Sequence, residues 1–582
     1  MRTLLLLLIA LSSLWFKCSA QKEGAGQNFA SMILDAGTKE PLPYATVFNK
    51  TQKRGTASSE NGLFELPNTN VGDTILISYI GYTDKIVLFQ IDFTKTILLQ
   101  TQASDLEEIV VRAESDYLYD LLVKLRKCKR AKTHNAKTYF FLESKQKGNI
   151  VEMIESYFQG KYSNCSLQNL NIKKGRIGLK PIDDRFYLST ETSRVFSMHD
   201  LFNHSNSFPS NPLCYRKKPM KNIYELSLQS TYDLDDDKIY VIQFWPKESK
   251  NSTSRKSLFS GTVWLNKEKN QIIKIVLSKE KSKNHPFKPI GPNTILDVSM
   301  EISKTFQEIE KEAKINAIDF NYTIYYMDQN KVPYEAFTKA YLKAYDFESS
   351  FKLPHFYFTD LLHQDYRNMT IVPYDSLFWN SSDEFRLFEQ ETRIETFLDE
   401  NHLQNEFIIP DTNRSQSCLQ YHYVNWSKNR IDIRSSKKET LTLKNFRDPY
   451  AYNEDLYNFN CKIYLDVNEF GSKKDFQLFS IIDPVDSYFK TKVTNETRAF
   501  ANMYFDILEI EKRNLEKEIT KTENLSIKQI ETLYLQSQEA FEQRARRFAA
   551  DAIRGERMEG MKKWNAIILE ALGIDNLAIF LE

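Results

Sequence analysis

Apolar and polar residues alternate along much of the chain, or form short apolar runs, and both patterns predict strands. The segments with these patterns are 74–80, 138–143, 238–245, 259–266, 271–277, 313–326, 333–345, 429–434 and 461–467. In residues 116–125 and 496–580, apolar residues recur at every third or fourth position, which predicts helices. Ser526 and Gln529 form the capping-box pair that begins one of these helices. The pattern predicts a multidomain, mainly β protein that ends in helices.

The composition strengthens the β prediction. The chain has 31 Tyr and 39 Phe against only 17 Gly and 17 Pro, and aromatic side chains pack well on pleated, half-buried surfaces. The formal net charge is +1, so we expect no nucleic-acid partner, which needs clustered basic residues on one face. We interpret Lys127–Arg130, Lys173–Lys174 and Lys217–Lys218 as solvated surface.

The first 20 residues have the pattern of a secretory signal peptide. Arg2 precedes a short apolar run, and Cys18-Ser19-Ala20 supplies small residues for cleavage before Gln21. The alternative is a lipid attached to Cys18, although Trp15 and Lys17 stand where that signal prefers small or aliphatic residues. The run is shorter than the ~20 residues of a membrane span. We therefore expect an exported protein with no transmembrane span in the mature chain, located in the periplasm or at the outer-membrane periphery.

Shifts in pattern suggest how the chain is divided. After the signal peptide (1–20) we predict a β-sandwich (28–112), a linker of helix and strand (113–160), a central β-rich domain (161–404), a small β or α/β unit (405–495) and a helical region (496–582). Within the sandwich, Asn61-Gly62 lies between two strand candidates, which predicts a β-hairpin with a type I′ turn.

The sandwich residues resemble a known family. Segments 41–47, 55–56, 61–66 and 77–82 read PLPYATV, GT, NGLFEL and ISYIGY. They resemble the carboxypeptidase-regulatory-like, or prealbumin-like, Greek-key sandwich of Bacteroidetes envelope proteins. The resemblance covers about 85 residues and implies a binding and scaffolding module without catalysis. In receptors of that kind a plug follows the sandwich, but residues 116–125 here have helical periodicity instead.

A second, shorter resemblance lies in the central domain. Gly261, Trp264, Leu265 and Asn266, followed by the IIKI of residues 272–275, resemble the curved half-barrel of periplasmic lipoprotein carriers. In that family a concave apolar face binds an acyl chain or another apolar ligand. The resemblance implies that Trp264 and the facing aromatic residues line a cavity. The alternative is a plain antiparallel sheet whose aromatic residues fill its own core.

The chain shows no familiar catalytic or metal-binding motif. Its eight histidines include no H-E-x-x-H pair, which argues against a zinc peptidase despite the family's name. His355 with His363, near Asp360 and Asp365, and His199 with His204 are weak metal candidates, and the acidic run Asp233–Asp237 is a weak calcium candidate. We interpret all three sets as surface or hydrogen-bonded groups. We therefore predict no catalytic, cofactor-binding or metal-binding residues and no cofactor.

The cysteines and the C-terminal arginines allow two interpretations each. Of the six cysteines, Cys128, Cys165, Cys214, Cys418 and Cys461 follow the leader; buried free thiols are favoured over long-range disulfides. The stretch with Arg544, Arg546, Arg547 and Arg554 is interpreted as a solvated helix face rather than a membrane-surface helix, because acidic residues interleave.

Two functions follow from these patterns. The first is a non-enzymatic binding or assembly protein of the bacterial cell envelope, whose partner is an apolar ligand or an envelope protein. The alternative is an envelope hydrolase without a recognisable motif. A concave sheet lined only by aromatic and aliphatic residues favours the first, and a pocket with a Ser/His/Asp or two-carboxylate cluster favours the second.

Overall fold

The computed structural model describes residues 27–101, 115–126, 133–180, 192–355, 375–387 and 457–580, with short gaps inside these ranges, and also 189, 369, 396–397 and 424–426. The signal-peptide prediction for residues 1–20 and the strand predicted at 429–434 lie outside the described residues. The chain forms two compact units. The first is Met1–Leu106 with Tyr232–Asp236 and Asn380–Arg393, and the second is Glu107–Thr231 with Asp237–Trp379 and Ile394–Glu582.

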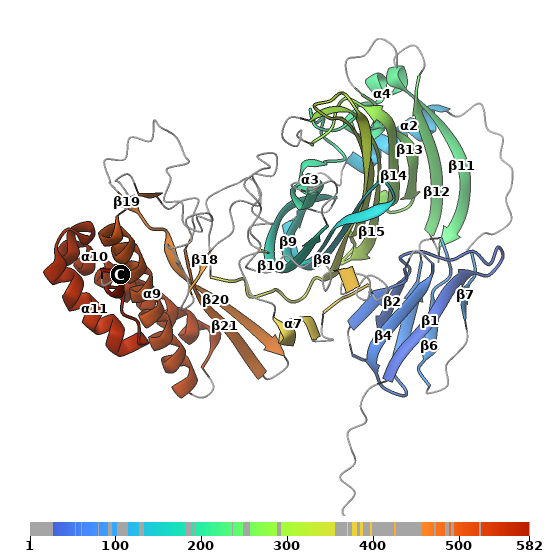
Figure 1. The fold of residues 1–582 in the computed structure, drawn as a ribbon. Helices are drawn as coiled ribbons and strands as arrows, with labels where there is room; N and C mark the ends of the chain where they lie inside the picture. The colour runs from blue at the N-terminus through green and yellow to red at the C-terminus, as the bar shows by residue number, and fades with distance from the viewer. Residues whose placement is uncertain are drawn as a thin grey trace, which may run out of the picture. The chain divides into compact units, whose positions relative to one another are not determined.

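The main body of the first unit is a β-sandwich (Figure 1). One sheet has the order β4-β1-β7, formed by Leu63–Thr69, Gln27–Asp35 and Ile97–Leu99. The other has the order β3-β2-β5-β6, formed by Arg54–Ala57, Thr46–Asn49, Thr74–Ser78 and Lys85–Leu88. The chain crosses between the sheets after β1, β3, β4 and β6, as in a Greek key. The inward side chains form one core that includes Phe29, Val47, Phe64 and Ile75, and the predicted sandwich is confirmed.

The predicted Asn61-Gly62 hairpin is wrong, although a tight turn does form there. The flanking strands β3 and β4 belong to different sheets, so the turn connects the two layers of the sandwich. Gly62 has a φ of +75°, and a Cβ at this position would lie 2.5 Å from the carbonyl oxygen of Ile33. The dipeptide correctly identifies a turn, but it does not determine which strands pair. β4 pairs with β1, and β3 pairs with β2.

A ten-stranded sheet dominates the second unit (Figure 1). Its order is β10-β9-β8-β17-β16-β15-β14-β13-β12-β11, and the strand pairs from β10 through to β12 are antiparallel. The strands are β8 (Thr133–Gln146), β9 (Asn149–Ser163), β10 (Ser166–Leu179), β11 (Tyr224–Leu234), β12 (Asp237–Pro246), β13 (Ser260–Asn266), β14 (Gln271–Ser282), β15 (Thr294–Ile309), β16 (Glu312–Met327) and β17 (Pro333–Asp346). Every strand predicted between residues 238 and 345 is found.

The predicted linker at residues 113–160 does not describe this region correctly. Its helix is present as α2 (Ser115–Leu125), but β8 and β9 are interior strands of the large sheet. β8 pairs with β17, which lies about 200 residues further along the chain; for example, Leu142 is opposite Ala340. Local alternation predicted the strand at 138–143, but it carries no information about so distant a partner.

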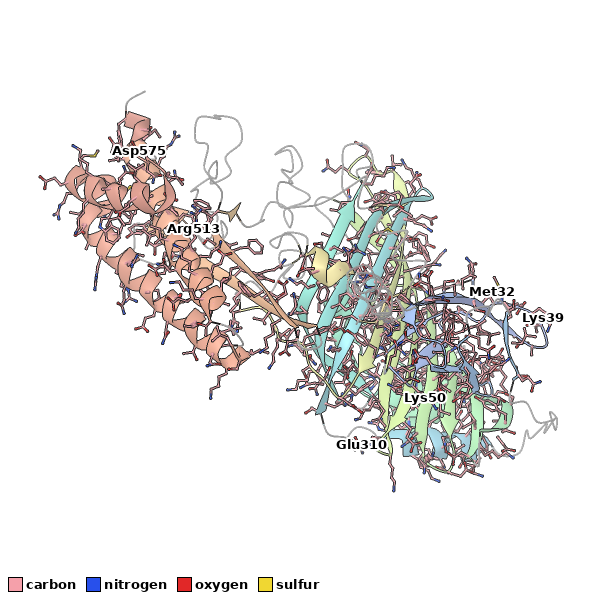
Figure 2. All side chains as sticks on the ribbon, turned by 90° about the horizontal axis from the view of Figure 1, so that it is seen from below. Met32, Lys39, Lys50, Glu310, Arg513 and Asp575 are labelled. Carbon is pink, nitrogen blue, oxygen red and sulfur yellow. The ribbon has the colours of Figure 1, made fainter. Side chains whose placement is uncertain are left out.

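Two-residue turns join several of these strands. Glu310 and Lys311 have φ values of 55° and 65° and connect β15 to β16, with Glu310 labelled in Figure 2. Lys147 and Gly148 connect β8 to β9 with φ values of 51° and 78°. Positive φ at both central residues is the type I′ geometry, which matches the right-handed twist of paired strands.

One face of the ten-stranded sheet, called the inner face from here on, is covered by helices. The inner face carries Phe140, Ile302 and Phe320, and it packs against α2, α3 (Thr192–Met198) and α4 (Lys217–Ile223) in one apolar core. In Figure 1 the sheet curves around α3. The outer face carries the alternate positions, such as Tyr139 and Tyr341. The short helix η2 (Pro212–Cys214) belongs to the inner-face covering.

The C-terminal part of the second unit has its own core. Strands β20 (Cys461–Phe470) and β21 (Lys473–Ile482) form a hairpin that packs against three helices. These are α9 (Asn495–Lys521), α10 (Ile527–Ala552) and α11 (Met558–Leu572), and the predicted Ser526–Gln529 capping box begins α10. The remaining elements are α7 (Ser376–Asn380), β18 (Val424–Asn425), β19 (Tyr457–Asn458), β22 (Tyr488–Phe489), η4 (Ile553–Gly555) and η5 (Ala578–Phe580).

Candidate functional site

Trp264 does not lie where the half-barrel resemblance implied. Its neighbours Val263 and Leu265 belong to the inner-face core, whereas Trp264 is half-buried on the outer face. There it lies opposite Lys274 of β14, whose Nζ is 5.2 Å from the centre of the indole ring. The expectation that Trp264 lines an apolar cavity is therefore wrong, because successive side chains of a strand point to opposite faces.

The aromatic residues that do meet on the inner face surround Phe320 of β16. The ring centre of Phe320 lies 4.9 Å from Tyr322, 6.0 Å from Phe196 and 6.2 Å from both Phe208 and Phe287. Phe196 lies on α3, and Phe208 lies in the segment that follows it. The apolar face of the sheet thus meets apolar side chains of its own covering segments, and this surface is the candidate binding site.

One lysine interrupts this apolar surface. Lys304 of β15 is in register with Ile275 and Ile318 on the neighbouring strands, and only 1% of it is exposed. Its Nζ donates a hydrogen bond of 2.9 Å to the carbonyl oxygen of His199, which directly follows α3. Burial lowers the pKa of Lys304 to about 8, although the nearby Asp200 and Cys165 oppose this effect.

His199 is the second polar group in this interior. Its ring packs edge-on against Phe208 and Phe259, with centroid distances of 5.0 and 6.1 Å. Within the part of the chain that the structure describes, neither Nδ1 nor Nε2 has a hydrogen-bond partner. Burial, assisted by the charge of Lys304, holds the pKa of His199 well below its ordinary value. The imidazole is therefore neutral, with one unused donor and one unused acceptor.

A third inner-face polar group, Glu152, is fully enclosed and well bonded. Its Oε2 accepts hydrogen bonds from Ser144 Oγ at 2.8 Å and from the backbone N–H of Ser189 at 3.0 Å. Ser144 Oγ also lies 3.0 Å from Thr338 Oγ1 on β17. Buried carboxylates need such partners, and we assign this network a structural role.

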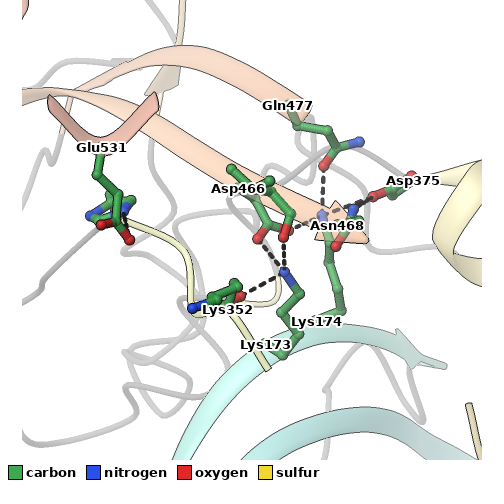
Figure 3. Close-up of polar contacts among 10 residues, drawn as sticks. Lys173, Lys174, Lys352, Asp375, Asp466, Asn468, Gln477 and Glu531 are labelled. Atoms are coloured by element: carbon green, nitrogen blue, oxygen red, sulfur yellow. Dashed lines mark hydrogen bonds and ion pairs between the residues drawn. The ribbon is translucent and has the colours of Figure 1, made fainter. Parts of the chain in front are cut away.

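The outer face has a buried ion cluster at the edge strand β10 (Figure 3). On β20, Asp466 Oδ1 accepts a hydrogen bond from Lys173 Nζ at 2.5 Å, and Asp466 Oδ2 forms an ion pair with Lys174 Nζ at 2.6 Å. Lys174 Nζ also lies 3.0 Å from Asp375 Oδ2 and donates to Gln477 Oε1 at 2.6 Å. The interpretation of Lys173 and Lys174 as solvated surface is therefore wrong.

A β-bulge explains how two successive lysines reach the same partner. The register of β10 against β9 shifts between Ile172 and Lys174, which leaves Lys173 as the extra residue. Lys173 Nζ also donates to the carbonyl oxygens of Lys352 and Val467, at 2.7 and 2.9 Å. Burial lowers the pKa of Lys173 despite Asp466. Burial alone would raise the pKa of Asp466, but the two ammonium groups hold it below its ordinary value.

A second buried ion pair lies on the same face. Both Nε and Nη2 of Arg176 lie 2.7 Å from Glu155 Oε2, and Tyr139 donates to Glu155 Oε1 at 2.9 Å. The guanidinium group stacks over the ring of Trp379, with its Cζ 4.3 Å from the ring centre. The ion pair joins the neighbouring strands β10 and β9, while the contact with Trp379, like the Asp466 cluster, joins β10 to a segment far away in the sequence.

The other candidate residues are dispersed. His355 Nε2 lies 3.6 Å from Glu531, His363 lies outside the described residues, and His204 Nδ1 is 3.0 Å from Ser210 Oγ. Asp237 pairs with Lys269 at 2.7 Å, while 235–236 are not described. Across the described residues, no three His, Cys, Asp or Glu side chains are placed to hold a metal ion.

The cysteines and arginines agree with the simpler interpretations where they are described. Cys165, Cys214 and Cys461 are buried thiols that form no disulfide among the described residues, and Cys128 and Cys418 are not described. Arg544 and Arg546 have side-chain exposures of 44% and 80% and pair with Glu511 and Glu542, as expected of a solvated helix face.

Sequence reasoning missed Lys304, although a signal was available. The inner-face positions of β15 are Val298, Met300, Ile302, Lys304 and Phe306. A lysine at an apolar position of a regular strand either reaches an edge or is buried with a partner. His199 was singled out only as a weak metal candidate.

Comparisons with known proteins bear on the N-terminal domain. The model of the CarboxypepD_reg-like domain family matches residues 32–111, and no curated protein matches the chain. The protein is therefore a multidomain, mainly β protein with a CarboxypepD_reg-like domain at its N-terminal end.

Two solved structures show distant likeness. A LolA superfamily protein from Nitrosomonas europaea is 11% identical, with a TM-score of 0.16 over 39% of this chain and 93% of its own. A protein of unknown function from Bacteroides fragilis is 8% identical, with a TM-score of 0.11 over 56% of this chain and 98% of its own. TM-scores this low establish neither a shared fold nor a shared function.

Proposed function

We propose that this protein is an exported, non-enzymatic protein of the bacterial cell envelope that binds an apolar ligand on the inner face of its ten-stranded sheet. The observation that carries the proposal is the aromatic cluster around Phe320. It is an extensive apolar surface on a long curved sheet, and short segments of the same chain cover it.

The covering segments are suited to being displaced. Helices α3 and α4 have seven residues each, and helices of this length hold their shape only through packing. An apolar ligand that packs on Phe320 and Tyr322 replaces the contacts that Phe196 and Phe208 make there. The exchange of one apolar contact for another costs little free energy, because the apolar area removed from water stays similar.

The location rests on the N-terminal end of the chain. The leader pattern of residues 1–20 supports export, and the CarboxypepD_reg-like domain supports an envelope protein of the Bacteroidetes type. Among the helices described here, none is both long enough and apolar enough to cross a membrane. We place the protein in the periplasm or at the periphery of the outer membrane.

The test is a titration of the purified chain, beginning at Gln21, with the uncharged fluorescent probe N-phenylnaphthylamine. We expect a saturable, blue-shifted signal that palmitate displaces. Phe320→Leu removes the central ring of the aromatic cluster and should weaken probe binding about five-fold, because a buried aromatic contact contributes about 1 kcal/mol beyond its area.

Phe141→Leu is the matched control. Phe141 is also a buried phenylalanine of the same sheet, but it lies on the outer face, opposite Glu155 and Tyr341. We expect it to leave the affinity for the probe unchanged. The absence of saturable binding to the wild-type chain, or equal losses in the two variants, would contradict the proposal.

A further inference from the structure

The ammonium group of Lys304 has fewer hydrogen-bond acceptors around it than it has donors. An ammonium group has three donors, and in the described part of the chain one acceptor, the carbonyl oxygen of His199, lies within hydrogen-bond distance of Lys304 Nζ. The neighbouring side chains in register, Ile275 and Ile318, offer none. The lysines of the outer-face cluster differ sharply, since Lys173 Nζ contacts three oxygen acceptors.

His199 adds a further unused donor at the same place. Its backbone oxygen binds Lys304, and its ring has no described partner for either nitrogen. The other groups near Lys304 do not supply the missing acceptors. Asp200 accepts with Oδ1 from the backbone N–H groups of Phe202 and Asn203 and with Oδ2 from the side-chain amide of Asn203, and Cys165 is a buried thiol. The interior thus holds unused donors on Lys304 and one on His199, surrounded by aromatic rings.

We propose that Lys304, together with His199, binds the anionic head of an amphiphile whose apolar chain lies on the aromatic inner face. This assignment rests on the function proposed above and specifies its ligand as a chain with a carboxylate or a similar anionic group. Carboxylate oxygens accept the ammonium donors in charge-assisted hydrogen bonds, which are the strong ones in a dry interior. An uncharged chain fills the apolar surface but leaves these donors unused.

The test compares a charged and an uncharged probe on the full chain. Cis-parinaric acid carries a carboxylate, and N-phenylnaphthylamine does not. Lys304→Met keeps the length of the side chain and removes the charge. We expect it to weaken cis-parinarate binding about ten-fold or more, since a hydrogen bond to a charged group contributes about 1.5–3 kcal/mol, and to leave N-phenylnaphthylamine binding within about two-fold.

Lys343→Met is the matched control. Lys343 is buried on the outer face, where its Nζ donates to Asn316 Oδ1 at 2.5 Å, and burial lowers its pKa to about 8 as well. It should bind both probes like the wild type. Equal loss of cis-parinarate affinity in the two variants, or none in Lys304→Met, would overturn the assignment.

Competition experiments on the wild-type chain separate the sources of the anion. Palmitate should displace cis-parinarate about ten-fold better than hexadecanol, while acetate and inorganic phosphate alone should not compete. Equal displacement by palmitate and hexadecanol overturns the headgroup site but leaves the proposed function intact. Competition by acetate or phosphate overturns the requirement for an apolar chain. Failure of N-phenylnaphthylamine to bind overturns both proposals.

A pH series keeps the inference testable if Lys304→Met does not fold. Lys304 loses its proton near pH 8, so palmitate affinity should fall by up to about ten-fold per pH unit above that value. His199 stays neutral throughout this range. The affinity for N-phenylnaphthylamine should not change. A palmitate affinity that is constant from pH 7 to 9.5 would count against the anion site.

Discussion

The Lys173–Lys174 cluster on the outer face of the ten-stranded sheet and Lys304 on its inner face are buried with different numbers of acceptors. On the outer face, Lys173 and Lys174 share the carboxylate of Asp466 and are further satisfied by carbonyl, carboxylate and amide oxygens. On the inner face, Lys304 has one described acceptor and apolar neighbours. The outer arrangement is complete without a ligand and serves the fold, whereas the inner one provides donors for a group that is not part of the chain.

The largest effect should come from breaking the complete cluster. Asp466→Asn removes the charge that two buried ammonium groups share, and such a loss typically costs about 3–5 kcal/mol. We expect the urea midpoint of the second unit, followed by tryptophan fluorescence, to fall accordingly. Removing every charge of the cluster, as Lys173→Met, Lys174→Met, Asp375→Asn and Asp466→Leu together, should cost less than Asp466→Asn alone, because no buried charge is then left unpaired.

Asp475→Asn is the control for that change. Asp475 lies on β21, and burial together with the charge of Asp375 raises its pKa. Neutralising this carboxylate should therefore leave stability the same or slightly higher. A loss comparable to that of Asp466→Asn would show that any carboxylate in this region matters equally, and the special role of Asp466 would be wrong.

The second effect is a pH dependence of stability, which should be similar for Lys304 on the inner face and Lys343 on the outer face. Lys304 and Lys343 each have a pKa of about 8 in the folded chain and an ordinary value of about 10.4 when unfolded. Between these values the unfolded chain binds more protons, so stability rises with pH, by up to about 3 kcal/mol for each lysine. Below pH 8 this contribution does not change with pH.

The measurement is the free energy of unfolding from urea titrations between pH 7 and 10.5. The difference between wild type and Lys304→Met should grow in favour of the wild type above pH 8, and Lys343→Met should behave in the same way. Saturating palmitate should move the start of that rise to higher pH for Lys304 and leave it unmoved for Lys343. A difference that does not vary with pH would mean that neither lysine titrates near pH 8.

The smallest effect should follow from changing Trp264. Trp264→Leu removes the contact with Lys274 on the outer face, which contributes about 1 kcal/mol or less. We expect little change in stability and an affinity for N-phenylnaphthylamine within about two-fold of the wild type. A large loss of probe binding would mean that the ligand occupies the outer face, which would reverse the comparison.

The sequence predicted strands well and their neighbours poorly. The alternation in β12, β13, β14, β16 and β17 located these strands to within a few residues. Alternation also separates Trp264 from Val263 and Leu265, but it does not say which of the two sets a covering helix packs against. The family's half-barrel pattern suggested the wrong set for Trp264.

The candidate site depends on contacts that no local pattern encodes. Lys173 meets Asp466 across 293 positions in the sequence, and Lys304 meets His199 across 105. In the sequence, Lys173 and Lys174 have the pattern of exposed surface, because lysines usually are exposed. The bulge that brings both ammonium groups to Asp466 depends on the pairing of β10 with β9. The burial of Lys304, by contrast, could have been predicted locally, because Lys304 stands at an apolar position of β15 between Ile302 and Phe306.

The pairing of β8 with β17 has a consequence for how the chain is made. β10, β9 and β8 form a meander early in the sequence, but the free side of β8 is filled only when residues 333–346 arrive. Until then, Phe140 and Leu142 stand on a strand with an open edge, the kind of surface that recruits other chains. Pairing between such distant segments also slows folding. The nascent protein therefore needs protection over the stretch of synthesis that separates these two strands.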